Sequence, residues 1–374
     1  MGDVTATSDW ATVLVEARRV AADIGELLGV EVDATTILAG RAAIMNLARP
    51  GRISAGGATR LLATADGWCA VALPRNDDVA ALSALMEVDA VTGDPWAALT
   101  HWAATRSTDS VVDRARLLDI AVAAPGEAAA EPPIMQRCGT GVGPRRADGL
   151  LVADLSSLWA GPLCGQLLAR AGAVVVKVES PSRPDGTRRG ELAFFDWMNA
   201  GKLSYCLDFD SDGDALRRLL NAADIVIEGS RPAALRRRGL SAGDLLGQPG
   251  RIWLRISGYR GQPDRPAFGD DAAVAGGLVG DGPVFLGDAI ADPLSGLEAA
   301  RAVGESLGRG GGEVIEVSMA QVAARYAVSP QTPDSGAGAA LPPVIAPAAP
   351  PASPLGADNA AVEQLISERL CAPC

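Results

Sequence analysis

The chain has 374 residues and a net charge of −12, and 48% of its residues are hydrophobic while 21% are charged. This length predicts two domains with a large buried core. The acidic balance excludes general binding to a nucleic-acid backbone, which needs a basic face. The sequence shows no apolar run of membrane-spanning length and no leader with a basic start, so we expect a cytoplasmic protein that does not enter the membrane.

The supply of histidine and cysteine limits the chemistry further. His101 is the single histidine, which excludes Ser-His-Asp hydrolysis and histidine-rich metal sites. The six cysteines are scattered along the chain, and we expect reduced thiols. Cys371 and Cys374 form one Cys-x-x-Cys pair, which supplies too few ligands for zinc, so we expect no metal. The reaction must therefore use carboxylates, hydroxyls, thiols or backbone amides.

Apolar strand-like segments alternate with helical segments between residues 150 and 318. We predict strands at 150–155, 173–179, 224–228, 251–256 and 313–318, and helices at 162–171, 211–222, 232–238 and 293–307. This alternation predicts an α/β fold with a parallel sheet that helices cover on both faces. A ligand of such a sheet is expected outside the carboxyl ends of its strands.

The first of these strands runs into the turn Ala160-Gly161-Pro162. Proline suits the first turn of a helix, and glycine allows the close approach of another group. A helix N-terminus of this kind attracts anions. A cluster of basic residues follows it, which suits the binding of a polyanionic small molecule. About half of these residues would also be explained as charges on solvated helix faces or at helix C-termini. These are Arg183, Arg188, Arg189, Lys202, Arg231, Arg236, Arg237 and Arg238.

Residues 150–188 resemble the opening of the family III CoA-transferases, the CaiB/BaiF type that includes formyl-CoA transferase and the α-methylacyl-CoA racemases. Further segments keep the order of that family, at 194–240, 251–261 and 308–321. Many residues of the opening motif match in order. They are Asp154, Ser156, Ala160, Gly161, Pro162, Gln166, Leu167, Leu168, Gly172, Ala173, Lys177, Val178, Glu179 and Arg188.

The resemblance covers most of residues 56 to 370 and implies a particular domain order. A Rossmann-like parallel-sheet domain that binds CoA would occupy 148–328. A smaller α+β domain would lie N-terminally, within 1–140 and family-like from about residue 56, whereas it normally follows the catalytic region. A Pro/Ala-rich linker at 329–352 would lead to a C-terminal helix at 353–374 that returns to the large domain.

Asp292 is the candidate catalytic residue. By itself, an Asp-Pro pair before a helical segment indicates an N-cap. The resemblance implies in addition that Asp292 is the family's nucleophilic aspartate, because Ser295 and Gly296 also match the pattern around it; the two roles are compatible in geometry. We expect its carboxylate to stay ionised at the helix N-terminus. It would attack the thioester of an acyl-CoA, and a carboxylic acid would then take over the CoA.

The resemblance also implies a set of contacts to CoA. Planar guanidinium groups and lysines suit its phosphates. Arg237 belongs to a run of three arginines and could equally be a charge at a helix C-terminus. The candidate binding residues are Leu158, Ala160, Gly161, Arg183, Arg188, Asn199, Lys202, Arg231, Arg237 and Tyr259.

The sequence favours a CoA-transferase that forms a homodimer, acts on an acyl-CoA and a carboxylic acid, and holds no permanent cofactor. One alternative is an acyl-CoA isomerase or racemase, in which Asp292 would work with Asp270 or a water. Asp270 stands where the racemases have a histidine. The other alternative is a CoA-binding protein that has lost its activity, because the segment between Ser257 and Asp292 is shorter than usual in the family. The sequence does not name the acid.

Overall fold

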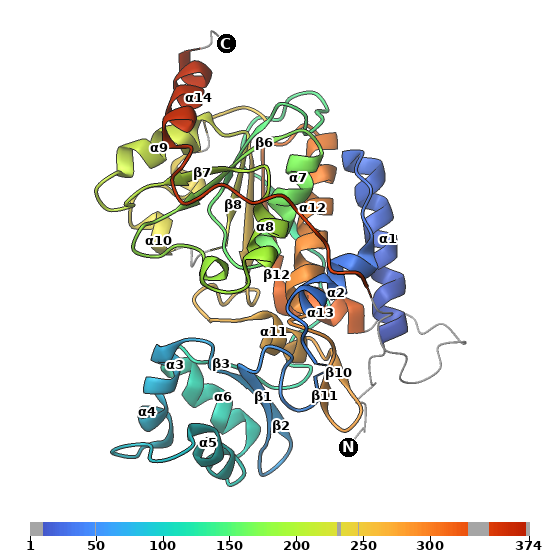
Figure 1. Ribbon diagram of the computed structural model, residues 1–374, viewed down its shortest axis with the longest axis vertical. Coiled ribbons are helices and arrows are strands. Elements are labelled where there is room, and N and C mark those ends of the chain that lie inside the picture. The colour runs from blue at the N-terminus through green and yellow to red at the C-terminus, as the bar shows by residue number, and fades with distance from the viewer. Residues whose placement is uncertain (1–9, 49, 230–232, 246, 328–343, 372–374) are drawn as a thin grey trace.

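The computed structural model describes residues 10–48, 50–229, 233–245, 247–327 and 344–371 of the chain. Two lobes are visible (Figure 1): a large one around a twisted sheet, and a smaller one that contains the strands β1–β3. None of the helices in the described ranges combines the length and the apolar character that a membrane span requires.

The large lobe is built on a seven-stranded sheet of the order β4-β12-β9-β8-β5-β6-β7. Strand β4 is antiparallel to β12, and every other neighbouring pair is parallel. In this order the strands are Ile134–Arg137, Glu313–Ser318, Ile252–Ser257, Ile225–Glu228, Leu151–Asp154, Val174–Glu179 and Leu203–Cys206. The predicted α/β class and the five predicted strands are confirmed, and β4 and β7 extend the sheet at its two edges.

Helices cover both faces of this sheet, as predicted. One hydrophobic core joins the sheet to seven helices: α1 (Trp10–Leu28), α2 (Ala34–Ile44), α7 (Ala160–Arg170), α8 (Leu192–Asn199), α11 (Gly269–Ala275), α12 (Ala291–Gly308) and α13 (Met319–Ala327). A second core joins the other face to α9 (Gly213–Ala222), α10 (Ala233–Arg236) and α14 (Asn359–Cys371). The 3-10 turns η1 (Gly186–Arg189) and η2 (Ala242–Asp244) lie between these elements.

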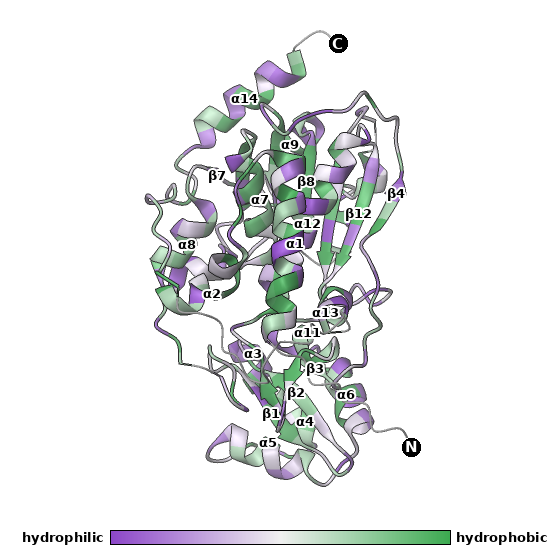
Figure 2. Cartoon of the chain, turned by 90° about the vertical axis from the view of Figure 1, so that its right-hand side faces the viewer, coloured by the Kyte–Doolittle hydropathy of each residue, from purple (hydrophilic) through white to green (hydrophobic). Residues whose placement is uncertain are grey.

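The small lobe has its own core around the antiparallel strands β1 (Thr59–Ala63), β2 (Trp68–Ala72) and β3 (Ala121–Ala123). Its helices are α3 (Asn76–Ala80), α4 (Leu82–Met86), α5 (Pro95–Ala103) and α6 (Thr108–Leu117). His101 lies exposed in the last turn of α5. Figure 2 shows β1–β3 as mainly hydrophobic. Between the lobes lie α11 (Gly269–Ala275) and a ribbon of β10 (Val279–Gly280) and β11 (Val284–Phe285).

The division of the first 140 residues differs from the expected one. The α1 residues Val13, Ala17, Val20 and Ile24 recur every three or four positions and are buried in the core of the large lobe, where α1 packs on α12. Strand β4 pairs with β12 of the large sheet. The small lobe's strands and helices therefore lie within 59–123, because the amphipathic helix α1 buries its apolar stripe on the large lobe.

The topology of the large sheet determines where a site can form. From β5 the chain crosses to β6 and β7 on one side and then returns to β8 on the other side of β5. Connections that leave in opposite directions from neighbouring strands open a crevice at the carboxyl ends of those strands. A ligand site is therefore expected beyond the carboxyl ends of β5 and β8.

Candidate active site

A cavity of about 210 Å³ opens at the carboxyl ends of four parallel strands. Ser156 follows β5, Gly229 follows β8, Ser257 ends β9 and Met319 follows β12, and all four line the cavity. The cavity therefore lies at the crevice that the strand order creates.

The predicted turn forms one wall of this cavity through Leu158, Ala160 and Gly161. Helix α7 begins at Ala160, two residues before the predicted start. Leu158 has a positive φ of 71° and donates its backbone N–H to Asp185 at 3.2 Å. Position 161 requires glycine, because a Cβ atom there would lie 2.1 Å from the Ser156 hydroxyl. The turn thus places the N-terminus of α7 on the cavity.

Asp292 lines the same cavity from the first turn of α12. The two helices cross closely, since a Cβ at Gly296 would lie 2.8 Å from the Ala160 carbonyl oxygen. The expected N-cap role is wrong: Ile290 is the N-cap residue, and Asp292 lies inside the helix. The Asp292 carboxylate instead accepts a hydrogen bond from the backbone N–H of Gly269.

The environment of Asp292 favours its neutral form. Its side chain keeps a partly exposed edge on the cavity but is otherwise enclosed by protein. Burial raises its pKa to about 7, the charge of Arg41 opposes this shift, and Asp270 and Asp288 add to it. The expectation that the carboxylate stays ionised therefore needs correction, because desolvation outweighs the helix N-terminus.

Arg41 on α2 is the cation beside these acids. Its Nη1 donates to Asp288 Oδ1 at 2.7 Å, and its guanidinium lies 5.4 Å from the ring centres of Trp159 and Phe194. Burial raises the pKa of Asp288 to about 6 in spite of this pairing. Arg41 and Asp288 were not among the residues predicted from the sequence, although Arg41 is the only charged residue in the otherwise apolar or neutral helix α2.

Asp270 is the third acid of the group. It accepts hydrogen bonds from the Thr59 hydroxyl at 3.1 Å and from the Ala289 backbone N–H at 3.0 Å. Burial raises its pKa as well. Asp270 does not belong to the lining of the cavity that contains Asp292. The structure therefore places it beside the nucleophile candidate, with its oxygens already bonded to the protein.

Two arginines that the sequence analysis did not select also line the cavity. Arg75 follows β2 of the small lobe, and Arg265 precedes α11. Arg265 is 5% exposed, pairs with Glu127 and stacks on Tyr259. In the sequence, the position of Arg75 after an apolar strand was the one indication that it could belong to a site. Because Arg75 and Asp292 are far apart in the sequence, their placement at one cavity could not be inferred.

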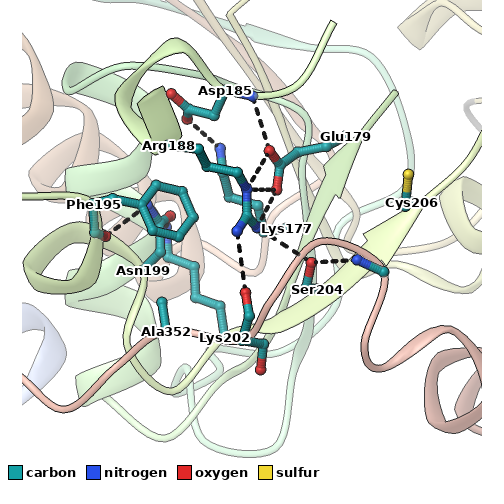
Figure 3. Close-up of polar contacts among 12 residues, drawn as sticks. Lys177, Glu179, Asp185, Arg188, Phe195, Asn199, Lys202, Ser204, Cys206 and Ala352 are labelled. Carbon is teal, nitrogen blue, oxygen red and sulfur yellow. Dashed lines mark hydrogen bonds and ion pairs between the residues drawn. The ribbon is translucent and has the colours of Figure 1, made fainter. Parts of the chain in front are cut away.

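Lys202 and Asn199 are buried, and Figure 3 shows both in the group of polar residues that also contains Lys177 and Arg188. The Lys202 ammonium donates to Asp154 at 2.9 Å, to the Pro162 carbonyl at 2.9 Å and to Asn199 Oδ1 at 3.1 Å. Burial alone would raise the pKa of Asp154, but the charges of the buried lysines outweigh it and lower that pKa. These placements hold the start of α7 and leave both side chains without access to the cavity.

Arg188 belongs to a neighbouring network (Figure 3). It pairs with Glu179 at 2.7 Å and lies 4.1 Å from the ring centre of Phe195. Lys177 pairs with Asp185 at 2.8 Å and donates to the Ser156 carbonyl at 2.7 Å. This network fixes the turn from the side of β6.

The remaining predicted residues do not line the cavity. Arg183 and Arg237 are exposed, and Arg231 lies outside the described residues. Tyr259 is buried, and its hydroxyl has no hydrogen-bond partner among the described residues. The structure thus brings together Leu158, Ala160, Gly161 and Asp292 of the predicted set.

Comparison with known proteins adds a family assignment. A family model described as CoA-transferase family III matches residues 148–356. The chain is 32% identical over 200 residues to succinyl-CoA–D-citramalate CoA-transferase of Chloroflexus aurantiacus, covering 47% of this chain and 50% of that protein. It is 34% identical over 200 residues to the probable fatty acyl-CoA transferase Rv3272 of Mycobacterium tuberculosis. This match covers 47% of this chain and 51% of that protein.

The chain spans about half the length of these curated relatives. Among solved structures, it is similar to a CaiB/BaiF family protein from Brucella suis, with 29% identity and a TM-score of 0.44. That match covers 48% of this chain and 55% of the other.

Proposed function

Because the chain belongs to CoA-transferase family III, we propose that it transfers CoA from an acyl-CoA to a carboxylic acid with Asp292 as the nucleophile. The observation that carries the proposal is that Asp292 and the N-terminus of α7 line one cavity at the carboxyl ends of the parallel strands. The relatives are named for CoA transfer, which supports the same general reaction.

In the proposed reaction, the Asp292 carboxylate attacks the thioester carbonyl of the donor, and the CoA thiolate leaves. The resulting mixed anhydride is attacked by that thiolate at the aspartyl carbonyl, which releases the donor acid and leaves an aspartyl-CoA thioester. The acceptor carboxylate attacks this thioester, and the thiolate then attacks the acceptor's carbonyl. This last step releases the new acyl-CoA and restores the Asp292 carboxylate.

Each step passes through an oxyanion in a confined site. The first turn of α7 offers backbone N–H groups and a positive dipole end to the cavity, which is the kind of group that stabilises developing negative charge. We propose that these N–H groups act on the oxyanions. The buried pairs of Lys202 with Asp154 and of Lys177 with Asp185 would keep the turn in place during the cycle.

CoA is a substrate in this proposal, and no permanent cofactor takes part. We propose that exposed Arg183 and Arg237 contact its phosphates from outside the cavity, together with Arg231. Arg188, Asn199 and Lys202 would support the turn rather than touch the ligand, since their charged or amide groups are bonded to the protein. Tyr259 would act through its stacking on Arg265.

The isomerase alternative is less well supported. Two-base proton transfer needs a second acid–base group that faces the substrate beside Asp292. Asp270 is the candidate, yet it does not line the cavity, and both of its oxygens accept hydrogen bonds. Incorporation of deuterium from solvent at the α-carbon of an acyl-CoA, without transfer, would favour the isomerase.

The decisive test is the intact mass of the protein after incubation with a panel of acyl-CoAs, with and without hydroxylamine. We expect a hydroxylamine-sensitive adduct on wild type and none on Asp292→Ala. Asp281→Ala is the matched control, since Asp281 is exposed in the turn between β10 and β11. An adduct that survives in Asp292→Ala, or CoA binding without any adduct on wild type, would contradict the proposal.

Assembly and location stay predictions from the sequence. We propose a homodimer, which light scattering after size-exclusion chromatography would show as twice the mass of the 374-residue chain. We also propose that the protein is cytoplasmic and that its small domain precedes the catalytic region, whereas it normally follows it in the family. A monomer at all concentrations would count against the assembly without touching the role of Asp292.

A further inference from the structure

We propose that Arg75 binds a second carboxylate of the substrate, so that the cavity selects short acyl groups that end in a carboxylate. The inference rests on the proposed function and specifies its substrate class. Arg75 comes from the small lobe, outside the segment that matches the family model.

The guanidinium of Arg75 is held in place from one side. Its Nε donates to Asp78 at 3.0 Å, and its Nη2 donates to the Asp119 carbonyl at 3.0 Å. Its Nη1 has no hydrogen-bond partner among the described residues. Asp78 is 3% exposed, whereas the Arg75 side chain is 45% exposed. A cation fixed in this way can offer its remaining N–H groups to a ligand without first losing side-chain freedom.

Arg75 lines the same cavity as the proposed nucleophile. Its guanidinium carbon lies 5.7 Å from the ring centre of Phe268. The next residue, Gly269, donates its backbone N–H to the Asp292 carboxylate. Arg75, Phe268 and Asp292 all line one cavity. In the proposal, a short acyl chain bound to Asp292 extends through this cavity toward Arg75.

The size of the cavity favours a short acyl group. Its volume of about 210 Å³ is below the roughly 300 Å³ at which pockets for drug-sized ligands begin. Pro263, Pro266 and Ala267 form its wall beside Phe268. A long acyl chain would have to leave the cavity, whereas a chain of a few carbons would be enclosed.

The charges around the cavity make a cation necessary for such a ligand. Asp292 is the nucleophile candidate, and Asp270 and Asp288 lie within its electrostatic range, so a ligand with a free carboxylate would be repelled. The lining contains two arginines. Arg265 is 5% exposed and pairs with Glu127, while Arg75 is exposed to the cavity. Arg75 is therefore the residue that can compensate a second negative charge.

The test uses the donor half-reaction alone, so that no acceptor acid is present. Full-length wild type is mixed with succinyl-CoA or with butyryl-CoA, in which a methyl group replaces the distal carboxylate, and the adduct on Asp292 is timed by intact mass. We expect succinyl-CoA to react faster by at least about tenfold, as a charge-assisted hydrogen bond allows. Equal rates on wild type would overturn the inference without any variant.

Variants then assign the selectivity to one side chain. Arg75→Met should lower the ratio of the succinyl to the butyryl rate by about 10- to 100-fold, and Arg75→Lys should retain part of it. Arg106→Met is the matched control, because Arg106 stacks on Trp102 in the same lobe and does not line the cavity. Its ratio should equal that of wild type.

The outcomes separate this inference from the proposed function. An unchanged ratio in Arg75→Met, with circular dichroism and melting temperature as in wild type, would overturn the inference alone. Failure of both donors to form any adduct on wild type would overturn the proposed function, and the selectivity with it. If Arg75→Met does not fold, Arg75→Lys and the wild-type ratio still decide.

Discussion

At the scale of single residues, Asp292 combines two demands that oppose each other. A nucleophilic carboxylate must be ionised, yet the confined cavity that protects an anhydride from water disfavours the charge. The pKa of about 7 is the balance between burial, which raises it together with the charges of Asp270 and Asp288, and the charge of Arg41, which lowers it. A carboxyl group with such a pKa changes its protonation state within the physiological range of pH.

The first prediction concerns the pH dependence of acylation. Only the ionised form of Asp292 attacks, so kcat/KM for adduct formation should rise with pH, pass its midpoint near pH 7 and level off above it. Measurement between pH 5 and 9 with a saturating donor series checks this. A midpoint near pH 4, the usual value for an aspartate, would show that the carboxylate is not desolvated.

The same shift predicts an effect on stability. The pKa of Asp292 is higher in the folded protein than the usual 3.8, so ionisation destabilises the folded state once the pH exceeds the unfolded pKa. Asp292→Asn should therefore have a higher free energy of unfolding than wild type at pH 8, by up to about 4 kcal/mol for a shift of about three pKa units, and the difference should vanish near pH 4. Urea unfolding at both pH values measures this. A larger gain in unfolding free energy at pH 4 than at pH 8 would contradict a raised pKa of Asp292.

Arg41 should tune the nucleophile without touching the substrate. In Arg41→Met, the loss of its charge should move the midpoint of the pH–rate profile upward by about one pH unit, and Arg41→Lys should restore part of the shift. Arg19→Met is the control, since the Arg19 side chain is 52% exposed on α1. A fall in rate at every pH with an unchanged midpoint would indicate a purely structural role for Arg41.

At the scale of elements, the C-terminal segment completes the edge of the large sheet. Asp358 accepts the Ser204 backbone N–H at 2.8 Å. Asn359 accepts the Cys206 N–H and donates to the Cys206 carbonyl, each at 2.9 Å. These side chains satisfy groups of β7 that a further strand would otherwise bind, and they cover an edge that would be exposed to pairing with other chains.

The contacts of this segment predict a loss of stability when they are removed. Asn359→Ala would leave two backbone groups of Cys206 without their partner, and we expect a loss of about 1–3 kcal/mol in unfolding free energy. Gln364→Ala is the control, because the side chain of exposed Gln364 donates to exposed Glu368 on the same helix. Equal urea midpoints for the two variants would show that β7 does not depend on the segment.

The sequence predicts some elements well for a physical reason. The parallel strands β5, β6, β8, β9 and β12 are buried and rich in Val, Ile and Leu, so each is visible as a short apolar run. Strand β4 is not, because Ile134–Arg137 is exposed and has no pattern of burial. Helix α1 has a clear apolar stripe, but a stripe does not reveal the surface against which it packs.

At the scale of the whole molecule, the candidate site combines three distant parts of the chain. Asp292 and the α7 turn belong to the large lobe, Arg75 to the small lobe and Arg41 to an N-terminal helix. Asp292 could be predicted because its neighbours Ser295 and Gly296 match a family pattern. Arg41, Arg75 and Asp288 could not, since only the folded chain brings Arg75 to the cavity and pairs Arg41 with Asp288 near Asp292.

The packing of α2 against the large lobe also bears on how separable the catalytic part is. Residues 148–356 match the family model, yet Arg41, the cation that opposes the raised pKa of Asp292, lies more than a hundred positions before them. A fragment limited to the matched segment would keep its nucleophile and both neighbouring acids and lose the charge that balances them. The family segment is therefore not a module that can be moved to another protein on its own: its electrostatics are distributed over the chain, and any transplant or shuffled variant has to carry the N-terminal helices with it.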